Sequence, residues 1–181
     1  MFQPRVKLEF IRRYLAPDNG WKVYVDIDAS EEGRTGGTLT ANQQRMREDA
    51  SRVKEALARF GVQVGGPRGD WFEAGSFPRV AGDRDIVAFH TKRRRCVIAE
   101  IEGESTGQSE QKLYKAMGQL VMAMSVNTVE GWDTLFVLVV HGEKIAAHLE
   151  RAKALQKLNI SGLALARDAA ADRWYFGRRL G

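Results

Sequence analysis

The sequence contains a single cysteine, Cys96, which excludes an internal disulfide. It has no apolar run near the roughly 20 residues that a membrane-spanning helix needs. The first 14 residues carry charges throughout, unlike a secretion signal. These absences predict a protein of a reducing, cytoplasmic compartment that has no membrane contact. The chain also has no helicase or ATP-binding motif, so we expect it to act alone or with a partner chain and without an organic cofactor.

What the sequence does contain suits a single globular domain. Of 181 residues, 44% are hydrophobic and 28% are charged. Lysine and arginine total 28 against 23 acidic residues, and the resulting net charge of +5 favours a polyanionic partner without requiring one. A glycine-rich polar stretch, Ser30 to Gly37, is typical of a loop. We therefore divide the chain into residues 1–37, an N-terminal arm or an extension of the sheet, and a main domain, residues 38–181.

Hydrophobic periodicity predicts the order of the elements. An alternating pattern predicts a strand over 21–27, and helical spacing predicts a helix from Thr40 to Phe60, which Gly61 ends. The later elements are strands over 70–76, 84–90 and 96–102, a helix over 108–124, a buried strand over 134–140, a helix over 143–158, and strand-like segments over 160–167 and 173–177. This order predicts an α/β fold with a central mixed sheet flanked by helices.

Three acidic residues fall where two of these strands meet. Asp85 begins one apolar strand, and Glu100 and Glu102 end the next, on the same face of that strand because side chains alternate. If the strands pair through the basic turn at 92–95, the three carboxylates converge. Such carboxylates repel one another unless a cation neutralises them, and hard oxygen ligands suit Mg²⁺ or Mn²⁺.

Together with the order helix, three strands, helix, strand over residues 40–140, these acids make the chain resemble the PD-(D/E)XK nuclease superfamily. Asp85 and Glu100 stand at the positions of that family's acidic residues, whereas Arg84 replaces the usual proline and Glu102 replaces the usual lysine. The resemblance implies a restriction-endonuclease-like core. It also implies a metal-dependent deoxyribonuclease, an endonuclease of restriction, repair or mobile-element type. Many members of that family pair, so the resemblance makes a homodimer conceivable.

The resemblance also assigns roles. It implies that Asp85, Glu100, Glu102 and the main-chain carbonyl of Ile101 hold the metal ion. Because Glu102 stands in place of lysine, either Glu102 accepts a proton from water or a lysine of the following helix fills the space. We favour Lys112 or Lys115 as a contact to phosphate or water, with Glu102 as base or second metal ligand. The residues expected to contact DNA are Gln108, Gln111, Lys112, Lys115, Arg93 and Arg94.

Simpler interpretations exist for each feature taken alone. Asp85 suits a turn, and the glutamates suit an exposed strand end. The basic turn at 92–95 equally suits a solvated hairpin tip. His90 and His141 are typical of core or strand-edge histidines, and Glu48 of a solvated helix surface. The aromatic run 174–176 between arginines suits core packing better than base stacking. The joint occurrence of the acids in this order of elements is what favours catalysis.

Two further functions stay open. One is a catalytically inactive nucleic-acid-binding module that keeps the nuclease fold but has lost efficient chemistry with the lysine that Glu102 replaces. The other is a structural or toxin–antitoxin-like interaction protein in which the acids are surface residues. Cleavage of DNA in the presence of metal separates the first from an enzyme, and a metal titration separates the second.

Overall fold

A computed structural model describes residues 1–28, 31, 40–65, 80, 84–103, 109–126 and 131–180. Its helices are α1 (Gln3–Tyr14), α2 (Ala41–Arg59), α3 (Ser109–Val126) and α4 (Glu143–Arg151), with short 3₁₀ turns η1 (Pro17–Asn19), η2 (Lys153–Leu158) and η3 (Ala169–Ala171). Its strands are β1 (Trp21–Val25), β2 (Gln63–Val64), β3 (Ile86–His90), β4 (Arg95–Glu102), β5 (Asp133–His141), β6 (Ile160–Leu165) and β7 (Arg173–Phe176). In these ranges no helix is both long and apolar enough to cross a membrane.

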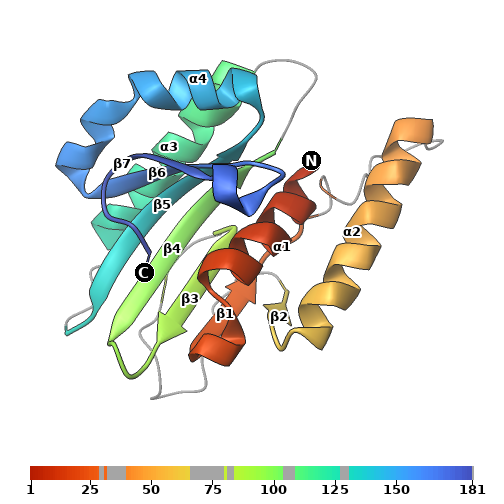
Figure 1. The fold of residues 1–181 in the computed structure, drawn as a ribbon, viewed down its shortest axis with the longest axis horizontal. Coiled ribbons are helices and arrows are strands. Elements are labelled where there is room, and N and C mark those ends of the chain that lie inside the picture. Colours follow the sequence, from red (N-terminus) through yellow and green to blue (C-terminus); the bar gives the residue numbers. More distant parts are fainter. Residues whose placement is uncertain are drawn as a thin grey trace.

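The seven strands form one mixed sheet in the order β2-β1-β3-β4-β5-β6-β7, with helices on both faces (Figure 1). The strands β1, β3 and β4 are successively antiparallel, whereas β4, β5 and β6 run parallel. The helix α3 makes the crossover from β4 to β5, as a parallel connection requires. The structure therefore confirms the α/β class and the mixed sheet between helices.

The structure shows that the first helix and the first strand of the expected order (helix, three strands, helix, strand) were assigned to the wrong segments. We predicted that the helix after Thr40 and a strand over 70–76 come first. Instead α1 and β1 come first, because β1 pairs with β3 along its full length. The helix α2 and the strand β2 lie between β1 and β3 in the chain. The strand β2 pairs with β1 and so extends the sheet beyond it. Residues 70–76 lie outside the described part of the chain.

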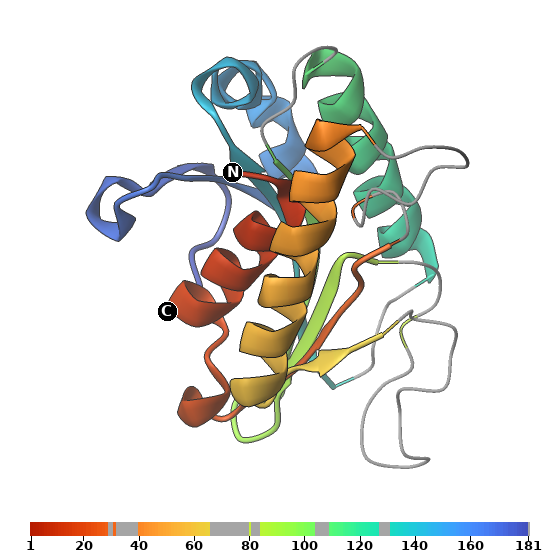
Figure 2. The same cartoon turned by 90° about the vertical axis from the view of Figure 1, so that its right-hand side faces the viewer.

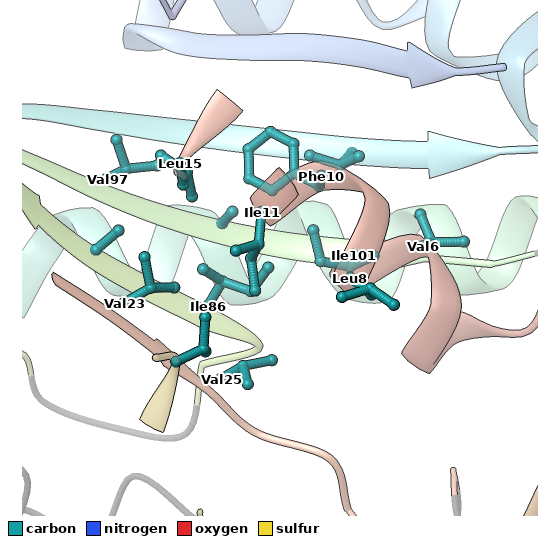
Figure 3. Packing of buried hydrophobic residues seen from close by; sticks show 14 of the residues in the cluster. Val6, Leu8, Phe10, Ile11, Leu15, Val23, Val25, Ile86, Val97 and Ile101 are labelled. Atoms are coloured by element: carbon teal, nitrogen blue, oxygen red, sulfur yellow. The ribbon is translucent and has the colours of Figure 1, made fainter. Parts of the chain in front are cut away.

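One face of the sheet is covered by α1 and α2, which lie side by side (Figure 2). Along α1 the apolar side chains recur at helical spacing, which gives the helix a buried stripe. Figure 3 shows this stripe packed against alternate residues of β1, β3 and β4. The buried members of the cluster include Val6, Phe10, Ile11, Val23, Ile86, Val97 and Ile101. Residues 1–28 thus supply both a strand of the sheet and one wall of the core.

The other face is covered by α3 and α4. Its core takes the alternate residues of the same strands, among them Phe89, Cys96 and Ile98, together with Leu113 and Leu120 of α3. Cys96 is fully buried as a free thiol, which confirms the structural interpretation of this residue. The predicted helix over 143–158 divides in the structure: α4 ends at Arg151, and η2 follows.

Candidate active site

The three predicted acids lie at one end of the β3–β4 hairpin. Ile86 pairs with Ala99, so the antiparallel register makes Asp85 the next cross-strand neighbour of Glu100. Glu100 and Glu102 are both buried, and their side chains alternate with Ile101, which packs on the α1 side. The two glutamates therefore point toward the α3 side of the sheet.

Asp85 is held by contacts on both carboxylate oxygens. Its Oδ2 accepts a hydrogen bond of 2.7 Å from the backbone N–H of Ile101, and the Gln3 side chain lies 3.5 Å from the same atom. Its Oδ1 lies 2.7 Å from Nζ of Lys7. Since Lys7 comes from α1, Asp85 joins the helix on one face of the sheet to the end of β4.

Lys7 is completely buried and meets three oxygen acceptors. Besides Asp85, its ammonium group donates to Oε2 of Glu31 at 2.8 Å and to the carbonyl of Asp26 at 2.6 Å. Burial alone lowers the pKa of Lys7, but the charges of Asp85 and Glu31 outweigh it and raise the pKa above its usual value. Burial also raises the pKa of Glu31 to about 7, against the opposing effect of Lys7. Lys7 is thus a fixed positive charge within a group of acids.

Glu100 is the predicted acid whose pKa the surroundings raise most. Burial and then the charge of Asp85 hold the pKa of the Glu100 carboxyl far above its usual range, although Arg84 and Lys7 oppose this. Its Oε1 is buried, lies 3.9 Å from Nη1 of Arg84, and accepts no hydrogen bond from the part of the chain that the structure describes. An ionised Glu100 therefore needs additional positive charge nearby.

Glu102 lies between the acids and α3. Burial raises the pKa of its carboxyl to about 7, and Asp85 adds to this effect, whereas Lys112, Lys115 and Lys7 lower it. Lys112 and Lys115 are exposed on α3, so their ammonium groups lie in solvent within electrostatic range of Glu102. The structure thus places the two lysines that the sequence singled out within electrostatic range of one of the predicted acids, Glu102.

A cavity of about 260 Å³ is lined by the start of α1, by Met46 of α2 and Lys112 of α3, and by Glu31 and Gly103. Gly103 follows β4 directly. A Cβ atom at this position would lie 2.7 Å from the backbone nitrogen of Gln3, so only glycine lets the end of β4 approach the start of α1 this closely. Lys112 lines the same cavity.

Other predicted residues lie elsewhere. Arg93 and Arg94 occupy the turn at the opposite end of β4 from Glu102, and Nε of Arg94 donates to the carbonyl of Gly131 at 2.8 Å. The strand β4 has eight residues and spans roughly 26 Å. Arg93 and Arg94 are therefore too far from Glu102 to contact the same phosphate. Gln111 is exposed on α3, and Gln108 lies outside the described residues.

The donor set suits Mg²⁺ or Mn²⁺ in its chemistry. Across the described ranges, no group of three His, Cys, Asp or Glu side chains stands in position to hold a metal ion. Mg²⁺, however, usually binds through one or two carboxylates together with waters and substrate phosphates. Asp85 and Glu100 supply such a pair, and the buried Oε1 of Glu100 is an acceptor in need of a cation. The residues therefore fit the ion.

Sequence reasoning missed Lys7 and Glu31. Lys7 carried a signal, because it falls on the apolar stripe of α1 between Pro4 and Ile11, where a lysine is out of place unless it is paired. Glu31 carried none, since it falls in a polar stretch of the sequence, and its buried side chain accepts hydrogen bonds from Lys7 and from the backbone N–H of Asp28. Comparison with known proteins adds no further assignment: the chain matches no protein-family model, no curated protein and no solved structure.

Proposed function

We propose that this protein is a metal-dependent deoxyribonuclease with a PD-(D/E)XK-type core. The observation that carries the proposal is the register of β3 and β4: Ile86 pairs with Ala99, which sets Asp85, just before β3, beside Glu100. It is supported by the surrounding order α1, β1, β3, β4, α3, β5, which matches the order expected for that core. Magnesium and DNA as cofactor and partner belong to the proposal, and pairing of two copies stays a prediction.

Each residue has a proposed part in phosphodiester hydrolysis. Asp85, Glu100 and the carbonyl of Ile101 would hold the ion, whose chemistry would be to lower the pKa of a water and to offset charge on the phosphate. Glu102 accepts a proton from water, because a carboxyl with a pKa near 7 is suited to general base catalysis. Lys112 and Lys115 contact the phosphate from α3. Lys7 fixes the orientation of Asp85.

The test is cleavage of supercoiled and linear DNA with Mg²⁺ or Mn²⁺, in the parent protein and in Glu100→Gln. This substitution keeps the side-chain shape and cannot ionise, and because the raised pKa of Glu100 already disfavours its charged form, the fold should be retained. We expect metal-dependent nicking by the parent and a loss of at least about a hundredfold in the variant. Loss of activity without loss of stability separates a catalytic role from a structural one.

Glu55→Gln is the matched control, because Glu55 is an exposed glutamate near the end of α2 and pairs only with Arg59 among the described residues. It should cut like the parent. Asp85→Asn should also be inactive, although it weakens the contact with Lys7. Full activity in both Glu100→Gln and Asp85→Asn would disprove the proposal.

One observation favours a second candidate, an inactive nucleic-acid-binding module. The ammonium group of Lys7 lies 2.7 Å from Oδ1 of Asp85 and so already supplies a positive charge to this acid. A parent protein that binds DNA, with or without Mn²⁺, but never cuts it would support the module.

A further inference from the structure

A second cavity, of about 670 Å³, opens at the same edge of the sheet. It is lined by the ends of β5 and β6, the first turn of α4, and residues of β7. Gly103 lines this cavity as well as the smaller one beside the carboxylates, so the two adjoin at the end of β4. We refer to the larger one as the β5–β6 cavity.

The position follows from the topology. The strands β4, β5 and β6 are parallel neighbours, so their carboxyl ends lie at one edge. Crevices at this edge of parallel sheets are common ligand sites because the connections that leave adjacent strands diverge. Gly142, with a φ of 114°, makes the turn from β5 into α4 that forms one wall.

The lining of the β5–β6 cavity is basic. It includes three exposed cationic side chains, Lys144, Arg167 and Arg173, against one acid, Glu143. The guanidinium of Arg173 lies 4.7 Å from the centre of the Tyr175 ring, a stacked position that directs a positive charge along the cavity rim. Exposed cations with an adjacent ring match the chemistry of a nucleic-acid strand, which offers phosphates and flat bases.

The rim is fixed to the same helix that positions Asp85. Arg13 of α1 donates to the carbonyl of Ala166 at 3.0 Å and to Oδ1 of Asp172 at 2.8 Å. The backbone N–H of Ala166 donates to the same carboxylate oxygen at 2.8 Å. Because Lys7 and Arg13 lie on one helix, that helix fixes the position of the cavity rim relative to Asp85.

We infer that the β5–β6 cavity binds the phosphodiester backbone of the DNA strand on one side of the phosphate to be cut. The inference rests on the proposed function, and it names the route of the substrate: past Gly103, between the first turn of α4 and the strand β7. A polymer presents phosphates on both sides of the scissile bond, and the basic cavity begins at Gly103, the residue that follows Glu102. Phosphate contacts of this kind give affinity without sequence preference.

The test is binding of a fluorescein-labelled DNA duplex in EDTA, followed by anisotropy at several NaCl concentrations. The double variant K144E/R167E reverses two exposed charges of the cavity, and glutamate in the first turn of α4 is compatible with the helix. We expect binding at least about tenfold weaker, with a salt dependence reduced by about two ionic contacts. The control R59E/K157E reverses two exposed charges that line neither cavity, Arg59 in the last turn of α2 and Lys157 in η2, and should bind like the parent.

The outcomes separate the two proposals because binding in EDTA needs no cleavage. Equal weakening by both double variants, or parental binding by K144E/R167E with an unchanged melting temperature, overturns the inference. Absence of binding by the parent overturns it too. Weakening confined to K144E/R167E supports it even if Glu100→Gln cuts like the parent, in which case only the proposed chemistry fails. Competition by a mononucleotide as effective as the duplex would assign the cavity to a small ligand instead and overturn the inference.

Discussion

At the scale of single residues, the buried lysine is the main determinant of the site. Lys7 meets the carboxylates of Asp85 and Glu31, and all three side chains are largely removed from water. A buried ion pair does not by itself stabilise a fold much, because burial of the charges costs about as much as their attraction returns. Loss of one partner is different, since it leaves the other charges buried and uncompensated.

We therefore expect Lys7→Met to lower the free energy of unfolding by about 3 to 5 kcal/mol. Urea denaturation followed by circular dichroism measures the change. Arg12→Met is the matched control, because Arg12 is 58% exposed and, among the residues that the structure describes, pairs only with Glu9 at 3.7 Å, so it should change stability by less than about 1 kcal/mol. Equal effects of the two substitutions would show that Lys7 is not the counter-charge of Asp85.

The close approach at Gly103 gives a second prediction. Gly103→Ala should destabilise the protein by about 1 to 3 kcal/mol, because the new methyl group would meet the backbone of Gln3 and displace the start of α1. Gly118→Ala, in the middle of α3 with open space around the new Cβ, should instead stabilise by up to about 1 kcal/mol. The melting temperatures of both variants test this prediction. A shift of both melting temperatures in the same direction would contradict it.

The raised pKa of Glu102 predicts a dependence on pH. Its ordinary value of 4.5 applies to the unfolded chain, and the folded value is about 7, so between these pH values the folded state binds the proton more tightly. The stability that this carboxyl contributes is present below about pH 4.5 and is lost as the pH rises to about 7. Glu102→Gln cannot ionise and should escape the loss.

Relative to the parent, Glu102→Gln should therefore be more stable at pH 8 than at pH 5, by about 1 to 2 kcal/mol once partial access of water is allowed for. Denaturation in EDTA at the two pH values measures the difference. A stability difference that stays constant between them, or that is larger at pH 5, would show that Glu102 has an ordinary pKa.

At the scale of elements, local signals set where α2 begins and ends. Thr40 accepts a hydrogen bond from the backbone N–H of Gln43, the Gln43 side chain accepts one from the Thr40 N–H, and Gly61 follows the helix with a φ of 75°. Such a capping box satisfies two donors that the first turn leaves open. The sequence was sufficient to predict both ends of this helix.

Thr40→Ala should cost about 1 kcal/mol, because one of these donors loses its acceptor. Since α2 contributes no predicted ligand, DNA cleavage should be unchanged at a temperature where the variant is folded. A combined measurement of melting temperature and nicking rate tests both statements. A loss of nicking by folded protein would indicate that α2 takes part in the site.

The chain order was harder to predict at this scale. The strands β3, β4 and β5 and the helix α3 carried clear periodicity, and all four formed close to the predicted ranges. The strand beside β3 was assigned wrongly. The periodicity of a strand shows which of its side chains are buried, but it does not show which strand pairs with it. In the chain, β1 is separated from β3 by a glycine-rich stretch and a complete helix. Only pairing in three dimensions identifies β1 as the neighbour.

At the scale of the whole molecule, the proposed metal ion would couple its binding to the stability of the fold. A ligand that binds only the folded state at about 100 times its dissociation constant adds about 2.7 kcal/mol. We expect Mn²⁺ to raise the melting temperature of the parent and to have a much smaller effect on Glu100→Gln. Calorimetric titration of the same proteins reports the binding directly. An equal rise in both would place the ion elsewhere.

The sequence alone determined the α/β class, the face of β4 that carries Glu100 and Glu102, and the proximity of Asp85, because each follows from side-chain periodicity and a short hairpin. The tertiary structure decided the rest: that α1 and β1 open the core, that Lys7 and Glu31 join Asp85, and that a basic cavity begins at Gly103, at the end of β4. These features bring together residues far apart in the chain. Their contacts depend on which faces pack together, and local patterns do not encode that choice.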